Sequence, residues 1–270
     1  MGQQPARGGF HWRIWGAEAL GTGLMVLAIV LAAGLTLGDG SPVAEALPSR
    51  GARFLALGVI IGPCVALIAV SPLGRISGAH LNPALTLGFW ALGRVCAADL
   101  AGYVAAQATG ALGGALVARL VLPGSVTDSI GGAVTHPSLT RAGALGVEAG
   151  MTALLVGVVL AFVSSERLAR WTPLAIVPLL AAIIWLGSPL TSASLNPARS
   201  AGPALAFADL TDLWLYLLAP PLGALAVALT WRLRETGPKT AKLFHDPRYP
   251  CSLRSELPAM PPDAPLPSRV

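Results

Sequence analysis

The chain has 270 residues, of which 54% are hydrophobic and only 11% are charged, so it is too apolar for an ordinary soluble domain. Its net charge of +5 comes from Lys and Arg residues scattered over loops and the C-terminal end, and the lack of a basic face interleaved with aromatic residues argues against nucleic acid as a partner. The three cysteines (Cys64, Cys96 and Cys251) are odd in number and far apart, which predicts neither a disulfide framework nor a metal site.

Apolar stretches, taken in chain order, predict six membrane-spanning helices. They cover approximately residues 14–37, 52–70, 97–122, 142–163, 172–188 and 213–232. About 20 residues cross the hydrocarbon core of a bilayer, which most of these stretches supply and the short fifth one reaches with the region around Trp171. The first stretch is too long for a removable signal peptide and lacks a small-residue cleavage site near its end.

Lys and Arg residues are unevenly divided between the two sides of the predicted helices, which sets the expected orientation. One side holds Arg7, Arg13, Arg75, Arg94, Arg167, Arg170, Arg232, Arg234, Lys239 and Lys242, whereas the other holds chiefly Arg50, Arg53, Arg119 and Arg141. The positive-inside rule therefore predicts a multi-pass protein of the inner or plasma membrane with both termini in the cytoplasm.

The tripeptide Asn-Pro-Ala occurs twice between the apolar stretches, at residues 82–84 and 196–198. Asn is a favoured helix N-cap and Pro suits the first helical position, so each copy predicts the start of a helix. At membrane depth such a start is tolerated only where it is buried in protein or lines a polar cavity, because its N–H donors are unpaired. Two starts predict two half-helices that meet at a pore, with Asn82, Pro83, Ala84, Asn196, Pro197 and Ala198 at their tips.

The two halves of the chain resemble each other. Residues 17–22 (AEALGT) are echoed by residues 147–152 (VEAGMT), and residues 77–84 (SGAHLNPA) are echoed by residues 192–198 (SASLNPA). Each repeat contains three spans, an odd number, so the second half is expected to be inverted in the membrane. Inverted repeats with broken helices at their interface mark a permeation site near the bilayer midplane.

These motifs, with their contexts SGAHLNPALTLG and SASLNPARSAGPAL and the paired glutamates Glu18 and Glu148, resemble the aquaporin (major intrinsic protein) family. The resemblance covers about residues 13–234, with repeats at about 13–122 and 142–234. It implies an all-α membrane protein of six transmembrane helices plus two re-entrant half-helices, usually assembled as a homotetramer in the lipid bilayer with one pore per subunit. It implies a passive channel for water and small neutral solutes that is not an enzyme and uses no cofactor.

The ends of the chain lie outside the expected channel domain. Residues 1–12 form a short N-terminal segment, and residues 235–270 are rich in Pro, with scattered charges and no helical period. Such a composition cannot bury enough apolar surface to fold alone. We therefore expect a disordered cytoplasmic tail, with partner binding or gating as the alternative.

The residues at the predicted pore have expected roles. The side chains of Asn82 and Asn196 offer amide donors to a passing solute, while the converging helix dipoles disfavour cations and hydronium. Arg199, three residues past Asn196, adds hydrogen-bond donors and repels cations.

Other polar residues lie in or beside the apolar spans. Glu18 and Glu148 are expected to accept hydrogen bonds from the loop backbone that leads into each half-helix, with a proton relay as the alternative. His80 either lines the path or satisfies loop carbonyls, and a pH gate is a further alternative. Gln107 is expected to bond across helices.

The resemblance also implies a selectivity filter built from four positions. Counting from the second triplet places three of them at Ile184, Ala193 and Arg199, and gapless counting from the first places the fourth at Gly62, or at Ile61 after a one-residue shift. Family members that conduct only water typically carry an aromatic residue in span two and a histidine in span five, and neither is present here. The expected filter is wide and weakly polar, which predicts passage of glycerol, urea, or metalloid acids such as boric and arsenous acid.

Two alternatives stay open. Ser200 and Ala204 match the pattern usual in water-selective members, so a strictly water-selective aquaporin is one alternative. An ion-coupled secondary transporter would also use inverted repeats and broken helices, with Glu18 or Glu148 as its coupling site.

Overall fold

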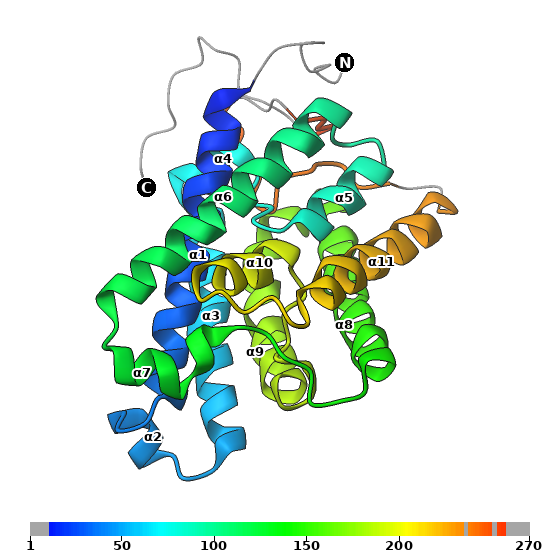
Figure 1. The fold of residues 1–270 in the computed structure, drawn as a ribbon. Helices are drawn as coiled ribbons and strands as arrows, with labels where there is room; N and C mark the ends of the chain where they lie inside the picture. The colour runs from blue at the N-terminus through cyan, green and yellow to red at the C-terminus, as the bar shows by residue number, and fades with distance from the viewer. Residues whose placement is uncertain (1–10, 235–236, 250–252, 258–270) are drawn as a thin grey trace.

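The computed structural model describes residues 11–234, 237–249 and 253–257, and within them the only regular structure is helical (Figure 1). Six helices are long and apolar enough to cross a membrane, which confirms the expected fold class. They are α1 (Trp12–Leu37), α3 (Arg50–Val70), α6 (Ala97–Val121), α8 (Arg141–Val163), α9 (Thr172–Thr191) and α11 (Leu213–Arg232). Two half-helices, α5 (Pro83–Ala91) and α10 (Pro197–Ala206), begin at the two triplets.

Shorter helices join these elements near the ends of the bundle. They are α2 (Pro42–Ala46), α4 (Pro72–Ser77), α7 (Gly124–Ser129), and the 3-10 turns η1 (Gly131–Ala133) and η2 (Ala169–Trp171). The start of α1, helix α4 and the end of α11 lie on one side of the bundle, which we call the His80 side. Helices α2 and α7 lie on the opposite side, which we call the Arg199 side (Figure 1).

Glycines let the long helices approach backbone to backbone. In the α1–α6 pair, a Cβ added at Gly110 would lie 2.0 Å from the carbonyl oxygen of Ala19. The corresponding pair of the second repeat, α8–α11, is packed alike, because a Cβ at Gly223 would lie 2.1 Å from the carbonyl oxygen of Ala149. Close packing of small residues is how helices associate in lipid, where apolar side chains gain nothing by avoiding the solvent.

The two repeats meet along α3 and α9. A Cβ at Gly58 would lie 2.7 Å from the carbonyl oxygen of Ala181, and a Cβ at Gly62 would lie 2.7 Å from that of Val177. Four residues forward along α3 thus correspond to four residues back along α9. This correspondence fixes which residues of the two helices lie at the same depth.

The described parts of the C-terminal tail pack against the His80 side of the bundle. Residues 237–249, which run through the orange range of Figure 1, contain no helix or strand, yet Thr240, Ala241 and Lys242 are fully buried. The sequence predicted a disordered tail from residue 235, and the structure differs because the backbone of this segment bonds to the helix ends. Residues 1–10, 235–236, 250–252 and 258–270 lie outside the described residues.

Candidate functional site

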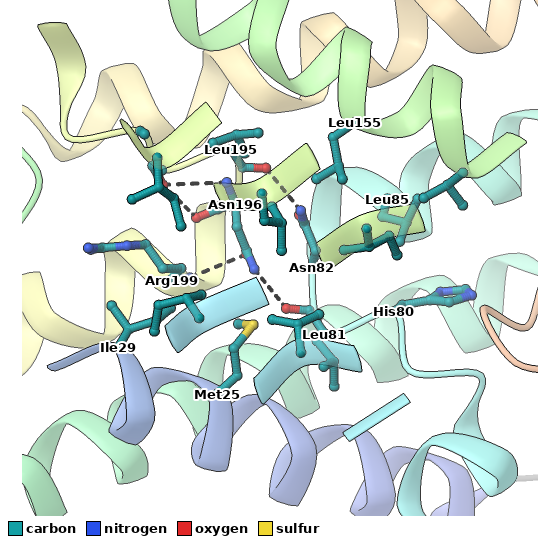
Figure 2. Close-up of a pocket in the computed structure, with 18 of the residues that line it drawn as sticks. Met25, Ile29, His80, Leu81, Asn82, Leu85, Leu155, Leu195, Asn196 and Arg199 are labelled. Atoms are coloured by element: carbon teal, nitrogen blue, oxygen red, sulfur yellow. Dashed lines mark hydrogen bonds between the residues drawn. The ribbon is translucent and has the colours of Figure 1, made fainter. Parts of the chain in front are cut away.

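The two half-helices meet at their N-terminal ends in the centre of the bundle (Figure 2). The Asn82 side chain accepts from the backbone N–H of Ala84 (2.9 Å), and its amide nitrogen donates to the carbonyl of Leu195 (2.9 Å). The Asn196 side chain caps α10 in the same way and donates to the carbonyl of Leu81 (2.8 Å). An amide nitrogen carries two hydrogens, so each asparagine keeps a second N–H for a solute in the cavity that both residues line.

Glu18 holds the loop that leads into α5. The carboxylate is fully buried and accepts from the backbone N–H groups of His80 (3.0 Å) and Leu81 (2.7 Å) and from the side-chain amide of Gln107 (2.7 Å). Leu81 has a left-handed backbone with φ of 52°, a conformation that is strained for a residue with a side chain. The carboxylate therefore stabilises the loop conformation that turns the Leu81 carbonyl toward Asn196.

Glu148 does the same for the loop that leads into α10. This fully buried carboxylate accepts from the backbone N–H groups of Ser194 (2.9 Å) and Leu195 (2.8 Å) and from the hydroxyl of Thr191 (2.7 Å). Leu195 again has a left-handed backbone, with φ of 57°. The hydrogen bonds that the Glu148 oxygens accept thus come from this loop and from the end of α9.

Arg199 lies on the first turn of α10, where its backbone N–H also donates to the side-chain oxygen of Asn196 (3.3 Å). Its guanidinium donates to the carbonyl of Ala133 in η1 (2.9 Å), which fixes the long side chain beside the cavity. Ala133 was not foreseen from the sequence, because no local motif marks a carbonyl as a partner.

A cavity of about 100 Å³ runs past both asparagines. Much of its apolar lining comes from matching stripes of two helices, with Leu57, Ile61 and Val65 on α3 and Ile176, Leu180 and Ile184 on α9. The loops and half-helix tips contribute His80, Asn82, Ala193, Ser194, Asn196 and Arg199 to the lining. A path lined by both apolar and hydrogen-bonding groups suits small uncharged molecules that have both characters.

Of the two residues expected for the span-two position, Ile61 lines this cavity and Gly62 does not. The Cα of Gly62 packs against the backbone of Val177 on α9. Gapless counting from Asn82 crosses the end of α3 at Val70 and the separate helix α4, so it does not keep the helical phase.

Leu57, which the sequence did not single out, also lines the cavity. Since Gly58 faces Ala181, Leu57 is the cavity-lining residue of α3 nearest in depth to Ile184. Ile61 also lines the cavity, but it lies about one turn deeper.

His80 lies at the opposite end of the cavity from Arg199, beside the orange C-terminal segment (Figure 2). Its Nε2 is 2.7 Å from the carbonyl oxygen of Ala241, which can only accept, so Nε2 carries the proton. Its Nδ1 is 3.1 Å from the hydroxyl of Thr86, and its ring stacks on Phe89 at 4.9 Å.

Ser200, which favoured the water-selective alternative, is fully buried away from the cavity lining. Its hydroxyl lies 2.5 Å from that of Ser194 and 2.9 Å from that of Thr135. Ser200 therefore ties α10 to the preceding loops and does not contact a solute in this cavity.

Comparison with known proteins identifies the fold and the family. The profile of the family described as Major intrinsic protein matches residues 7–231. Aquaporin Z of Brucella melitensis biotype 1 is 36% identical over 206 residues, which span 72% of this chain and 90% of that protein. Nodulin-26 of Glycine max is 32% identical over 218 residues, which span 80% of this chain and 76% of that protein.

Among solved structures, the aquaglyceroporin from Plasmodium falciparum has a TM-score of 0.65 at 22% identity, covering 81% of this chain and 94% of that one. At this identity the likeness supports the fold alone. The family profile extends over residues 7–231 and so includes both triplets. The chain therefore belongs to the major intrinsic protein family, whose members are membrane channels for water and small solutes and not enzymes.

Proposed function

We propose that the channel passively conducts water together with small uncharged solutes of the size of glycerol, urea, boric acid or arsenous acid, and excludes ions and protons. The observation that carries this proposal is the lining at the depth of Ile184. There the cavity is bounded by Leu57, Ile184 and Ala193, with Arg199 as the polar member. All three apolar members are aliphatic, so the opening lacks the aromatic ring and the histidine that would narrow it.

The arrangement of polarity supports passage of polyols and similar molecules. A solute such as glycerol can turn its hydroxyl groups to the guanidinium of Arg199 and to the second N–H groups of Asn82 and Asn196. Its carbon side then lies against the α3 and α9 stripes. Urea and the metalloid acids are also neutral hydrogen-bonding molecules, so they meet the same requirements.

Ion exclusion follows from charge at two depths. The N-terminal ends of α5 and α10 both point at the centre of the cavity, and each carries a partial positive charge. The guanidinium of Arg199 adds a full positive charge nearer the Arg199 side. A cation or hydronium ion is repelled at both depths.

A strictly water-selective channel is the second candidate, and the side chain of Leu57 favours it. Leu57 is larger than the glycine that gapless counting placed in span two, so the opening is narrower than that count predicted.

Orientation and assembly belong to the proposal as well. We propose that the His80 side faces the cytoplasm, because Arg75, Arg94, Arg232 and Arg234 gather there, as the positive-inside rule requires. A homotetramer is the assembly that the family resemblance implies.

The test is stopped-flow light scattering on proteoliposomes that hold the full chain, Leu57→Trp, or the control Val59→Trp. Val59 is on the same helix but is 55% exposed on its outer surface. We expect Leu57→Trp to lose glycerol and urea entry while keeping water flux, and Val59→Trp to behave as the unaltered chain does. Solute entry that survives in Leu57→Trp would contradict the placement of the filter, and water flux without solute entry in all three would establish the water-selective candidate.

A further inference from the structure

The segment of residues 237–249, here called the docked segment, follows α11 and crosses the channel on the His80 side (Figures 1 and 2). Its backbone bonds to two separate parts of the bundle. The N–H of Lys239 donates to the carbonyl of Val163 at the end of α8 (2.9 Å), and the N–H of Leu243 donates to the carbonyl of Gly78 after α4 (3.0 Å). The segment thus spans the mouth from the second repeat to the first.

Arg75 on α4 is the centre of the docking contact. Its guanidinium bonds to the carboxylate of Asp246 (3.0 Å) and lies 5.5 Å from the ring centroid of Phe244 and 5.8 Å from that of Tyr249. The backbone carbonyl of Arg75 accepts from the ammonium of Lys242 (2.5 Å). Four residues of the docked segment therefore surround a single residue of the bundle.

The burial of Lys242 indicates a specific contact. The residue is 0% exposed, although an ammonium group is expensive to remove from water unless it is paired. A loosely lying polar tail would leave this side chain in solvent. Lys242 therefore occupies a specific buried site, which a segment lying loosely on the surface would not provide.

Leu243 reaches the channel itself. Its side chain is 2% exposed and forms part of the cavity lining, next to Ala79 and His80. The neighbouring carbonyl of Ala241 holds the Nε2 proton of His80 (2.7 Å). The docked segment therefore fills the end of the path with an aliphatic side chain and occupies the hydrogen-bonding capacity of a lining residue.

We propose that residues 237–249 are a plug that closes the channel on the His80 side, with Leu243 as the occluding residue. The proposal rests on the proposed channel function, whose path it blocks. A solute that reaches this end of the path meets the side chain of Leu243 before it can enter the solvent. The solute also cannot replace the Ala241 carbonyl as the partner of His80 unless the docked segment dissociates.

The plug is suited to reversible release. The contacts around Arg75 lie outside the membrane-spanning helices. Asp246 is buried there, but its partners Arg75 and Arg248 are 27% and 43% exposed, so salt partly screens both ion pairs. The same holds for the pair of Arg94 and Glu256 (2.6 Å), which adds a further contact beyond the docked segment. Opening requires that these contacts and a few backbone hydrogen bonds break together, and that the buried side chains of Lys242 and Leu243 leave their sites.

The test compares water and solute flux in proteoliposomes for the full chain, Leu243→Ala, and the control Leu233→Ala. Leu233 follows α11 on the same side of the molecule and is 88% exposed. We expect Leu243→Ala to raise flux about tenfold, which corresponds to about 1.4 kcal/mol, and Leu233→Ala to leave it unchanged. A second variant, Arg75→Gln, releases the plug from outside the cavity and is expected to raise flux in the same direction.

Hydrogen exchange on the full chain in lipid nanodiscs provides an independent measurement. The amides of Lys239 and Leu243 are expected to be protected in the unaltered chain and to lose protection in Arg75→Gln. Equal, measurable flux in all variants would overturn the plug and leave the channel intact, as would a docked segment that exchanges freely in the unaltered chain. Flux no faster than empty vesicles in every variant would contradict the channel function, and the plug would fall with it.

Discussion

Replacement of Glu148 by Gln tests how the channel loops are held. The carboxylate accepts three hydrogen bonds, with Thr191 and Ser194 on one oxygen and Leu195 on the other. A glutamine keeps one oxygen, and its NH2 group must face an N–H or O–H donor. At least one buried donor is therefore left unpaired, at a cost of about 1–3 kcal/mol.

This cost can be followed as a change in melting temperature. For a chain of this size, 1 kcal/mol lowers Tm by about 2–4 °C, so Glu148→Gln is expected to lower Tm by roughly 2–12 °C. Glu45→Gln is the matched control, because Glu45 is an exposed glutamate on α2. Thermal unfolding followed by circular dichroism in detergent would measure both variants.

The expected loss extends to function. The Leu195 N–H that Glu148 holds belongs to the residue whose carbonyl accepts from Asn82. A loop that relaxes there alters the donors at the channel centre, so water flux of Glu148→Gln should also fall. The reasoning is refuted if Glu148→Gln has the same Tm as Glu45→Gln and the same water flux as the unaltered chain. The Glu148 carboxylate would then not be accepting hydrogen bonds on both oxygens.

Three further predictions concern charge, access and docking. Arg199→Ala should admit protons or small cations, seen as faster collapse of a pH gradient reported by a dye trapped in the vesicles, and an unchanged leak would remove Arg199 from ion exclusion. Ala193→Cys should create a reversible mercury block of water flux, whereas the unaltered chain should be inhibited only weakly, and strong inhibition that persists in Cys64→Ser would contradict the alignment. Arg248 and Arg75 lower the pKa of the Asp246 carboxyl below its ordinary 3.8. The ionised carboxylate therefore stabilises docking fully above pH 3.8, and this stabilisation is lost as the pH falls through the lowered pKa. Asp246→Asn should therefore weaken exchange protection of the docked segment at neutral pH, and its difference from the unaltered chain should persist to about pH 4 and vanish below; equal protection at neutral pH would contradict this.

The sequence predicted the helices well where hydrophobicity and capping act locally. The apolar stretches correspond to the six long helices, and the Asn-Pro pairs predicted the starts of α5 at Pro83 and α10 at Pro197. The fifth helix runs to Thr191, past the expected end at 188, because Pro189 is accommodated inside its last turn. A local rule for helix ends cannot foresee this, since neighbouring elements supply the packing.

Two features of the site could not be predicted because they depend on distant parts of the chain. Gapless counting gave Gly62 for the span-two position, and only a one-residue shift gave Ile61, which lines the cavity, since the phase of one helix cannot be counted through the separate helix α4. The composition of the tail correctly suggested no helix for residues 237–249, but it carries no sign that Lys242 is buried against the carbonyl of Arg75. Backbone partners of this kind leave no trace in a residue pattern.

The most direct test of the central claim is the stopped-flow comparison of water and glycerol gradients on vesicles that hold Leu243→Ala or the full chain, against empty vesicles. The account predicts that both proteins accelerate shrinking and glycerol-driven reswelling, and that Leu243→Ala does so more strongly. If neither protein makes vesicles respond faster than empty ones, to water and to glycerol alike, the claim that this chain forms a path for water and small uncharged solutes is contradicted.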